Sequence, residues 1–93
     1  MQYETIIQAG HPRLLLFFAG WASDTTPFRD YRPTRRDYII CYDYRTLEND
    51  FLPKNTYKEV DIVGWSMGVW AASHVAPALQ IPIRRSIALN GTP

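Results

Sequence analysis

The chain has 93 residues, of which 46% are hydrophobic, 14% aromatic and 20% charged. Ten Lys and Arg residues stand against nine Asp and Glu, so the formal net charge of +1 lacks the basic excess of a nucleic-acid-binding domain. The hydrophobic content is too high for a disordered chain, and the longest apolar run, Leu14–Ala19, is far shorter than the roughly 18 residues of a membrane span. The single cysteine, Cys41, excludes an internal disulfide, and Met1–Glu4 do not resemble the start of a signal peptide. We therefore expect a folded cytoplasmic domain that binds neither nucleic acid nor membrane.

The predicted strands follow one another along the chain as short apolar segments. Tyr3–Gln8 is expected to form an antiparallel edge strand, and Gly10–Pro12 a turn into the apolar run Arg13–Ala19. Three further strands are predicted at Asp37–Tyr42, Glu59–Val63 and Arg85–Leu89. Continuous apolar runs are typical of strands that are buried on both faces of a parallel sheet.

Helical patterns separate several of these strands. Met67–Leu79 carries apolar residues at spacings of three and four, and Pro77 should shorten or kink that helix. Ser23 or Asp24 is expected to cap a short helix that reaches at most Tyr31. Residues 45–57 are the least defined. The alternation predicts an α/β fold with a mostly parallel sheet and right-handed crossovers.

The segment Gly64-Trp65-Ser66-Met67-Gly68 matches the pattern Gly-x-Ser-x-Gly between a predicted strand and a predicted helix. This setting is that of a nucleophile elbow, in which a very tight turn raises the serine above the sheet. Side chains two residues before and after the serine would collide with the neighbouring strand and helix, which explains the two glycines. The alternative is that Gly64 and Gly68 merely allow close packing.

An elbow of this kind needs two N–H donors for the oxyanion that forms on the substrate. The first is expected from Met67, the residue after the serine, and the second from Trp21 in the loop that follows the first core strand. Trp65 is expected to line an acyl pocket or to pack in the core. The sequence has no phosphate-binding loop and no cluster of residues with metal-ligand spacing, so we expect neither a cofactor nor a metal.

Four blocks of residues resemble, in order, the N-terminal half of the BioG-type pimeloyl-acyl-carrier-protein methyl ester esterases, which are α/β-hydrolases of biotin synthesis. These blocks are Phe17–Trp21, Cys41–Arg45, Trp65–Ala72 and Leu89–Pro93. The resemblance implies a serine carboxylesterase that hydrolyses the methyl ester of pimeloyl bound to acyl carrier protein. It assigns Ser66 as the nucleophile, Trp21 and Met67 as oxyanion donors, and acyl carrier protein as a partner.

The rest of a catalytic triad is not visible in the sequence. α/β-Hydrolases place the acid and then the histidine after the serine. His11 precedes the serine, and His74 lies eight residues further along the helix, roughly 12 Å along its axis. We therefore expect residues 1–93 to be the N-terminal part of a single α/β-hydrolase domain, truncated before the cap, acid and histidine, with little esterase turnover of its own. The alternatives are a non-catalytic or degenerate hydrolase fragment, or a thioesterase or acyltransferase of the same fold.

Several other residues receive structural interpretations. Arg29, Arg32, Arg35 and Arg36 are expected to form a solvated loop rather than a carrier-protein contact, and Arg84 and Arg85 a surface edge. Trp70 is expected in the core. Cys41 is expected to be a buried apolar residue and not a nucleophile.

Overall fold

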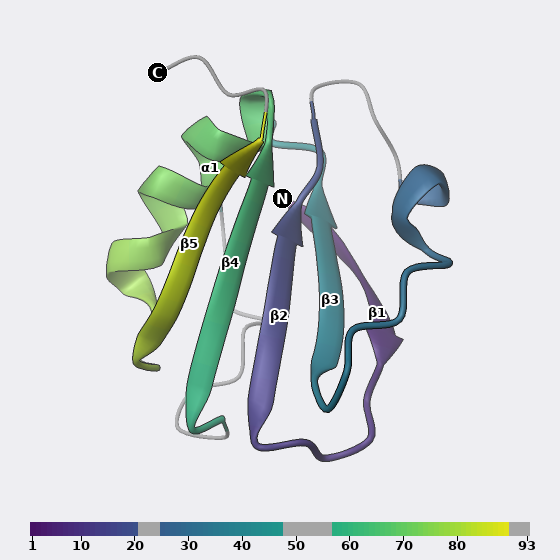
Figure 1. The fold of residues 1–93 in the computed structure, drawn as a ribbon. Coiled ribbons are helices and arrows are strands. Elements are labelled where there is room, and N and C mark those ends of the chain that lie inside the picture. The colour runs from purple at the N-terminus through teal and green to yellow at the C-terminus, as the bar shows by residue number, and fades with distance from the viewer. Residues whose placement is uncertain (21–24, 48–56, 90–93) are drawn as a thin grey trace.

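The computed structural model describes residues 1–20, 25–47 and 57–89, and these form one mixed sheet with a helix (Figure 1). The five strands are β1 (Gln2–Ile7), β2 (Arg13–Phe18), β3 (Asp37–Tyr42), β4 (Glu59–Trp65) and β5 (Ile83–Leu89). They lie in the order β1-β3-β2-β4-β5, with β1 antiparallel to β3 and every other pair parallel. The predicted antiparallel edge strand and parallel core are therefore confirmed, with small shifts in strand boundaries.

The helical elements are shorter than the sequence predicts. The helix α1 (Met67–Val75) gives way to a 3-10 turn, η2 (Ala76–Ala78), because Pro77 cannot continue the α-helical hydrogen bonding. A second 3-10 turn, η1 (Thr26–Phe28), ends before Tyr31, so the predicted helix there is reduced to one turn. The expected caps Ser23 and Asp24 and most of 45–57 lie outside the described residues. Thr25 precedes η1, and its hydroxyl donates to Glu4 rather than capping the turn (2.8 Å).

Side chains of the central strands alternate between two apolar layers. One layer lies under α1 and includes Leu14, Leu16 and Phe18 of β2. The other lies on the opposite face and includes Leu15 and Phe17. Because β2 contributes to both layers, it is buried on both faces, as its continuous apolar run predicts.

The helix α1 packs on the sheet through small residues. Its buried positions are Gly68, Ala71, Ala72 and Val75. They recur at spacings of three and four, which places them on one helix face. Trp70 falls outside this stripe: it is 42% exposed and lies against His74, with ring centroids 4.7 Å apart. The prediction that Trp70 is in the core is therefore wrong.

One further expectation concerns a buried group. Cys41 is fully buried, as predicted, and burial raises the pKa of its thiol. Across 1–20, 25–47 and 57–89, no helix is long and apolar enough to cross a membrane. In the same ranges, no group of His, Cys, Asp and Glu side chains has the arrangement of a metal site.

A buried carboxylate joins three segments at the amino ends of the parallel strands. Asp37 Oδ1 accepts hydrogen bonds from the N–H groups of Ala9 (3.0 Å) and His11 (3.3 Å), and Oδ2 accepts one from the Tyr57 hydroxyl (2.6 Å). Asp37 thus ties the β1–β2 connection and the residues before β4 to the start of β3. These contacts fix the end of the sheet that is opposite the candidate site.

Candidate active site

The chain bends sharply at Ser66, between the end of β4 and the start of α1. Trp65 is the last strand residue and Met67 the first helical one, so the reversal is completed at a single residue. Ser66 has φ 55° and ψ −121°, in the positive-φ region that side chains rarely adopt. Its side chain makes no capping hydrogen bond with the helix. The hydroxyl is therefore not engaged by the helix N-terminus it precedes.

The two glycines of the motif lie where a side chain has no room. A Cβ on Gly68 would be 2.0 Å from the carbonyl oxygen of Phe18, and a Cβ on Gly64 would be 2.9 Å from the backbone of Val69. These overlaps involve backbone atoms, which cannot swing aside as a flexible side chain can. The first turn of α1 therefore sits directly on the carboxyl end of β2, and both glycines are needed for the bend itself.

Hydrogen bonds hold the bend from two sides. The N–H of Ser66 donates to the carbonyl of Leu89 at the end of β5 (2.8 Å), and the N–H of Val69 donates to the carbonyl of Ser66 (3.0 Å). Met67 opens the helix, and amides of the first helical turn have no acceptor within the helix. Among the described residues its N–H has no hydrogen-bond acceptor, so it can donate to a ligand placed above the carboxyl ends of the strands.

The loop that follows β2 approaches the same end of the sheet. Trp21, the second predicted donor, lies outside the described residues. Ala19, two residues earlier, is buried, and its N–H donates to the carbonyl of Cys41 (2.9 Å). The Tyr44 hydroxyl donates to the carbonyl of Ala19 (2.5 Å) and lies 3.1 Å from that of Cys41. Tyr44 therefore anchors the start of this loop to the end of β3.

Trp65 borders the bend on the face of the sheet opposite α1. Its side chain is 37% exposed, and its ring centroid lies 6.2 Å from that of Phe28. Phe28 in turn packs against Phe17 of β2, with ring centroids 4.4 Å apart and ring planes tilted by 38°. Trp65 is thus a half-exposed member of an aromatic group, which leaves both of its predicted roles open.

Neither histidine lies where it could take a proton from Ser66. His11 precedes β2, whereas Ser66 follows β4, and these strands are parallel with Arg13 opposite Glu59 and Phe18 opposite Gly64. The two residues are therefore at opposite ends of the sheet. His74 is exposed near the end of α1, where its Nδ1 lies 2.9 Å from the carbonyl of Trp70.

One carboxylate does lie at the same end of the sheet as Ser66. Asp43 follows β3, with φ 58°. Arg45 donates to both of its oxygens (2.8 and 2.6 Å), and Gln2 donates to one (3.2 Å). These hydrogen bonds with Arg45 lower the pKa of the Asp43 carboxyl. Asp43 is engaged by its neighbours and has no histidine to orient among the residues described.

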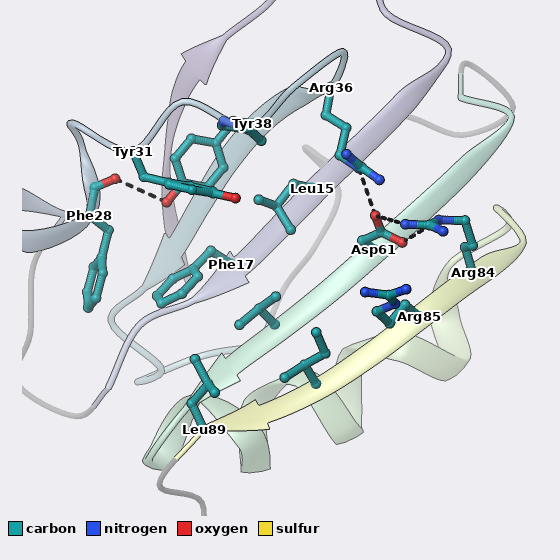
Figure 2. Close-up of a pocket in the computed structure, with 13 residues that line it drawn as sticks. Leu15, Phe17, Phe28, Tyr31, Arg36, Tyr38, Asp61, Arg84, Arg85 and Leu89 are labelled. Atoms are coloured by element: carbon teal, nitrogen blue, oxygen red, sulfur yellow. Dashed lines mark hydrogen bonds and ion pairs between the residues drawn. The ribbon is translucent and has the colours of Figure 1, made fainter.

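A second group of charges, which the sequence did not reveal, lies near the amino ends of β4 and β5. The Asp61 carboxylate receives Arg36 (2.8 Å) and both Arg84 nitrogens (3.1 Å each), and the three residues line an open groove of about 480 Å³ (Figure 2). Burial raises the pKa of Asp61, but the hydrogen bonds and charges of Arg84 and Arg36 lower it by more, so the net pKa lies below its ordinary value. The expectation that Arg36 belongs to a solvated loop is therefore wrong, because its side chain is only 21% exposed. Arg84 lies exposed on the edge strand β5, as predicted, and in addition pairs with Asp61.

The fold and the bend together define an α/β protein that presents a serine at the carboxyl edge of a parallel sheet, at the start of a helix. Such edges are where open α/β sheets place their binding sites. The chain belongs to the BioG family: the family model described as pimeloyl-ACP methyl esterase BioG matches residues 1–93.

Individual relatives give the extent of the similarity. The crystal structure of BioG from Haemophilus influenzae superposes with a TM-score of 0.87 at 33% identity, covering 99% of this chain and 42% of that one. A malonyl-[acyl-carrier protein] O-methyltransferase of Bacteroides fragilis is 54% identical over 89 residues, which are 91% of this chain and 18% of that protein. An uncharacterized Haemophilus influenzae protein is 38% identical over 80 residues, 85% of this chain and 36% of its own length. The chain thus spans less than half the length of each of these relatives.

Proposed function

We propose that this chain is the nucleophile-bearing part of a serine carboxylesterase of the α/β-hydrolase class, which hydrolyses the methyl ester of pimeloyl bound to acyl carrier protein. The observation that carries the proposal is the backbone of Ser66, held at φ 55° between two glycines whose side-chain positions are filled by backbone. A serine in this sparsely populated conformation is costly, and such outliers concentrate at functional sites. A packing role for the glycines alone would not require the serine between them to adopt positive φ.

The geometry supports acyl transfer through a covalent intermediate. The Ser66 hydroxyl oxygen attacks the ester carbonyl and loses its proton to a base, and the resulting oxyanion accepts hydrogen bonds from the N–H groups of Met67 and Trp21. Collapse of this intermediate breaks the bond to the methoxy oxygen, which leaves with a proton as methanol. Water then attacks the acyl-serine, releasing the carboxylate and restoring the hydroxyl.

The base and its orienting acid are the parts that the described residues do not supply. An alcohol without an adjacent base is a weak nucleophile at neutral pH. We therefore propose that residues 1–93 are one part of a single hydrolase domain, and that they have little esterase turnover by themselves. The 42% coverage of the solved relative leaves more than half of that chain to carry the remaining groups.

The identity of the substrate rests on the family description and on one relative. The family is described as an esterase for pimeloyl-ACP methyl ester, and the Bacteroides fragilis relative carries the name of an enzyme that methylates an acyl-carrier-protein-linked acid. Methylation of a carboxylate and hydrolysis of the ester are opposite steps on one kind of substrate. Together they favour a methyl ester carried by acyl carrier protein over a free small ester.

A fluorophosphonate reagent tests the nucleophile directly on the 93-residue chain. We expect slow labelling of the wild-type chain, acceleration when imidazole is added as an external base, and no labelling of Ser66→Ala under either condition. Ser73→Ala, which removes an exposed hydroxyl of α1, is the matched control and should label like the wild type. Absence of labelling even with imidazole, or equal labelling of Ser66→Ala, would reject Ser66 as the nucleophile.

The reaction itself is tested on a full-length relative that contains the equivalent serine. Incubation with methyl pimeloyl-acyl carrier protein should release methanol and leave the acyl chain on the carrier. Release of free carrier thiol without methanol would instead identify a thioesterase.

A further inference from the structure

The chain turns sharply after β3, at the same edge of the sheet as Ser66. β3 and β4 both run parallel to β2, so Asp43, which follows β3, and Ser66, which follows β4, lie at one carboxyl edge (Figure 1). Asp43 has φ 58° and Ser66 has φ 55°. Positive φ is uncommon for residues other than glycine, and such strained residues concentrate at functional sites. The edge that carries the candidate site thus holds a second strained residue.

The turn at Asp43 moves the chain from one face of the sheet to the other. In a straight strand, residues two positions apart point to the same face. Tyr42 packs against the apolar layer opposite α1, yet Tyr44 is buried in the layer under α1, together with Phe18 and Cys41. Asp43 is the one residue between the two tyrosines, so its backbone conformation decides the face on which Tyr44 lies.

Hydrogen bonds hold the side chain of Asp43 in place. Nε and Nη2 of Arg45 donate to its two carboxylate oxygens, and a paired geometry of this kind fixes orientation as well as adding energy. The side-chain amide of Gln2 donates to Oδ2 from β1. The Asp43 side chain is only 21% exposed, although the residue lies in a turn. The carboxylate thus restrains the turn from both β1 and the residues that follow.

Tyr44 connects this turn to the start of the loop after β2. Its hydroxyl donates to the carbonyl of Ala19, a fully buried residue whose own N–H donates to the carbonyl of Cys41. Burial raises the pKa of the Tyr44 hydroxyl, so the group keeps its proton and remains a donor. Both backbone polar groups of Ala19 are therefore held by the end of β3 and the turn that follows it.

We propose that Asp43 is a positioning residue for the candidate active site. By holding the turn after β3 it keeps Tyr44 under α1, and Tyr44 in turn holds Ala19 at the start of the loop after β2. The inference rests on the proposed function, in which Trp21 of that loop is the second oxyanion donor. An exposed ion pair such as that of Asp43 with Arg45 contributes little by itself, so an effect on the site has to pass through the turn.

Amide hydrogen exchange followed by NMR tests the link between Asp43 and the loop without depending on the reaction. In Asp43→Ala, the exchange rate of the Ala19 N–H relative to that of Ile62 in β4 should rise by about tenfold or more, because the opening is local. Asp43→Asn should stay within about threefold of the wild type, because asparagine tolerates positive φ and its amide oxygen still accepts a hydrogen bond from Arg45.

Imidazole-assisted fluorophosphonate labelling tests whether the link reaches Ser66. Asp43→Ala should slow labelling by about tenfold in the wild-type background but by less than about twofold in a Tyr44→Phe background, because both substitutions interrupt the same path. Asp43→Asn should label at close to the wild-type rate. A purely structural role of Asp43 would slow labelling by the same factor in both backgrounds, and this result would overturn the proposal. Unchanged exchange at Ala19 in Asp43→Ala would also overturn it.

Two further variants keep these outcomes interpretable. Asp30→Ala, which removes an exposed carboxylate outside the turn, is the control and should change neither rate. If circular dichroism shows that Asp43→Ala is unfolded, Arg45→Gln takes its place, since it removes the paired hydrogen bonds at a side chain that is 78% exposed. If Ser66 of the wild-type chain is never labelled, the proposed function fails, whereas exchange at Ala19 still decides whether Asp43 holds the loop.

Discussion

The carbonyl oxygen of Phe18 occupies the space in which a side chain of Gly68 would begin, 2.0 Å from the position of its Cβ. The first turn of α1 therefore rests on the backbone of β2. The helix can lie this close to the sheet at the candidate site only because residue 68 has no Cβ. In an ordinary helix interior, replacing glycine with alanine stabilises by about 1 kcal/mol. At Gly68 the overlap with the Phe18 carbonyl oxygen should make the same substitution destabilising.

We expect Gly68→Ala to lower the free energy of unfolding by at least about 2 kcal/mol, since overpacking against backbone forces the helix to move. Urea unfolding followed by circular dichroism measures this change. Gly10→Ala is the control, because a Cβ there would meet nothing within 4 Å and only its φ of 77° opposes the substitution. A Gly68→Ala chain as stable as the wild type would show that α1 is not held at this distance.

The positive φ of Ser66 should cost folding stability at the residue that we propose as the nucleophile. A residue other than glycine at such a φ costs of order 1–3 kcal/mol. We therefore expect Ser66→Gly to be about 1 kcal/mol more stable than Ser66→Ala in urea unfolding, while both lose fluorophosphonate labelling. Equal stability of the two variants would mean that the bend imposes no conformational cost at residue 66.

The Tyr44 hydroxyl is predicted to hold the start of the loop that carries Trp21, the proposed second oxyanion donor. Tyr44→Phe removes the hydrogen bond to Ala19 and leaves a buried carbonyl without that donor, which should cost about 1–3 kcal/mol. Tyr42→Phe is the matched control, since the Tyr42 hydroxyl makes no hydrogen bond with the residues described. If Tyr44→Phe slows imidazole-assisted labelling of Ser66 and Tyr42→Phe does not, then Tyr44 positions the loop. Equal labelling of the two variants would limit Tyr44 to a structural role.

Acid should weaken the fold through Asp37. Burial raises the pKa of this carboxyl, but the hydrogen bonds from the Tyr57 hydroxyl and from the N–H groups of Ala9 and His11 lower it by more. The net pKa is therefore below its ordinary value of 3.8. Because the pKa of Asp37 is lower in the folded than in the unfolded state, ionised Asp37 stabilises the fold at pH values above its unfolded pKa. This stabilisation is lost as the pH falls through the pKa of Asp37 in the folded state.

We therefore expect the unfolding free energy to decline as the pH drops below about 3.8, and Asp37→Asn to make this decline shallower. Tyr57→Phe, which removes the largest of the contributions that lower the pKa, should have an intermediate slope. Urea unfolding at a series of pH values measures these slopes. If Asp37→Asn has the same slope as the wild type, other carboxylates are responsible for the acid dependence.

The sheet and the bend could be predicted from sequence because their causes are local. An unbroken apolar run such as Leu14–Phe18 is readable without knowledge of its neighbours, and so is a serine between two glycines that follow a strand. The prediction for Trp70 fails because α1 faces the sheet with the small side chains of Ala71 and Ala72, which let the helix approach it closely.

The remaining features depend on contacts between segments that are distant in sequence. Arg36 is 25 residues from Asp61, and Tyr44 is 25 residues from Ala19. Nothing in either neighbourhood identifies the partner. The sequence does signal that Asp61 has a partner, because a charged residue in a mostly apolar strand is rarely buried unless it is paired. It does not signal which residue that partner is. The bulge in β5 that brings Arg84 and Arg85 to the same groove has no signature in the sequence.

The central position of β2 affects how the chain must fold as it is synthesised. The strand that forms both apolar layers is made early, but its two hydrogen-bonded neighbours, β3 and β4, are made later. At roughly 5–20 residues per second, the ribosome needs on the order of 1–4 s to reach β3 after completing β2. During that interval neither β3 nor β4 is available to cover Leu14–Phe18. The strand that the finished sheet protects best is therefore one that a newly made chain must leave uncovered until both of its neighbours have been made.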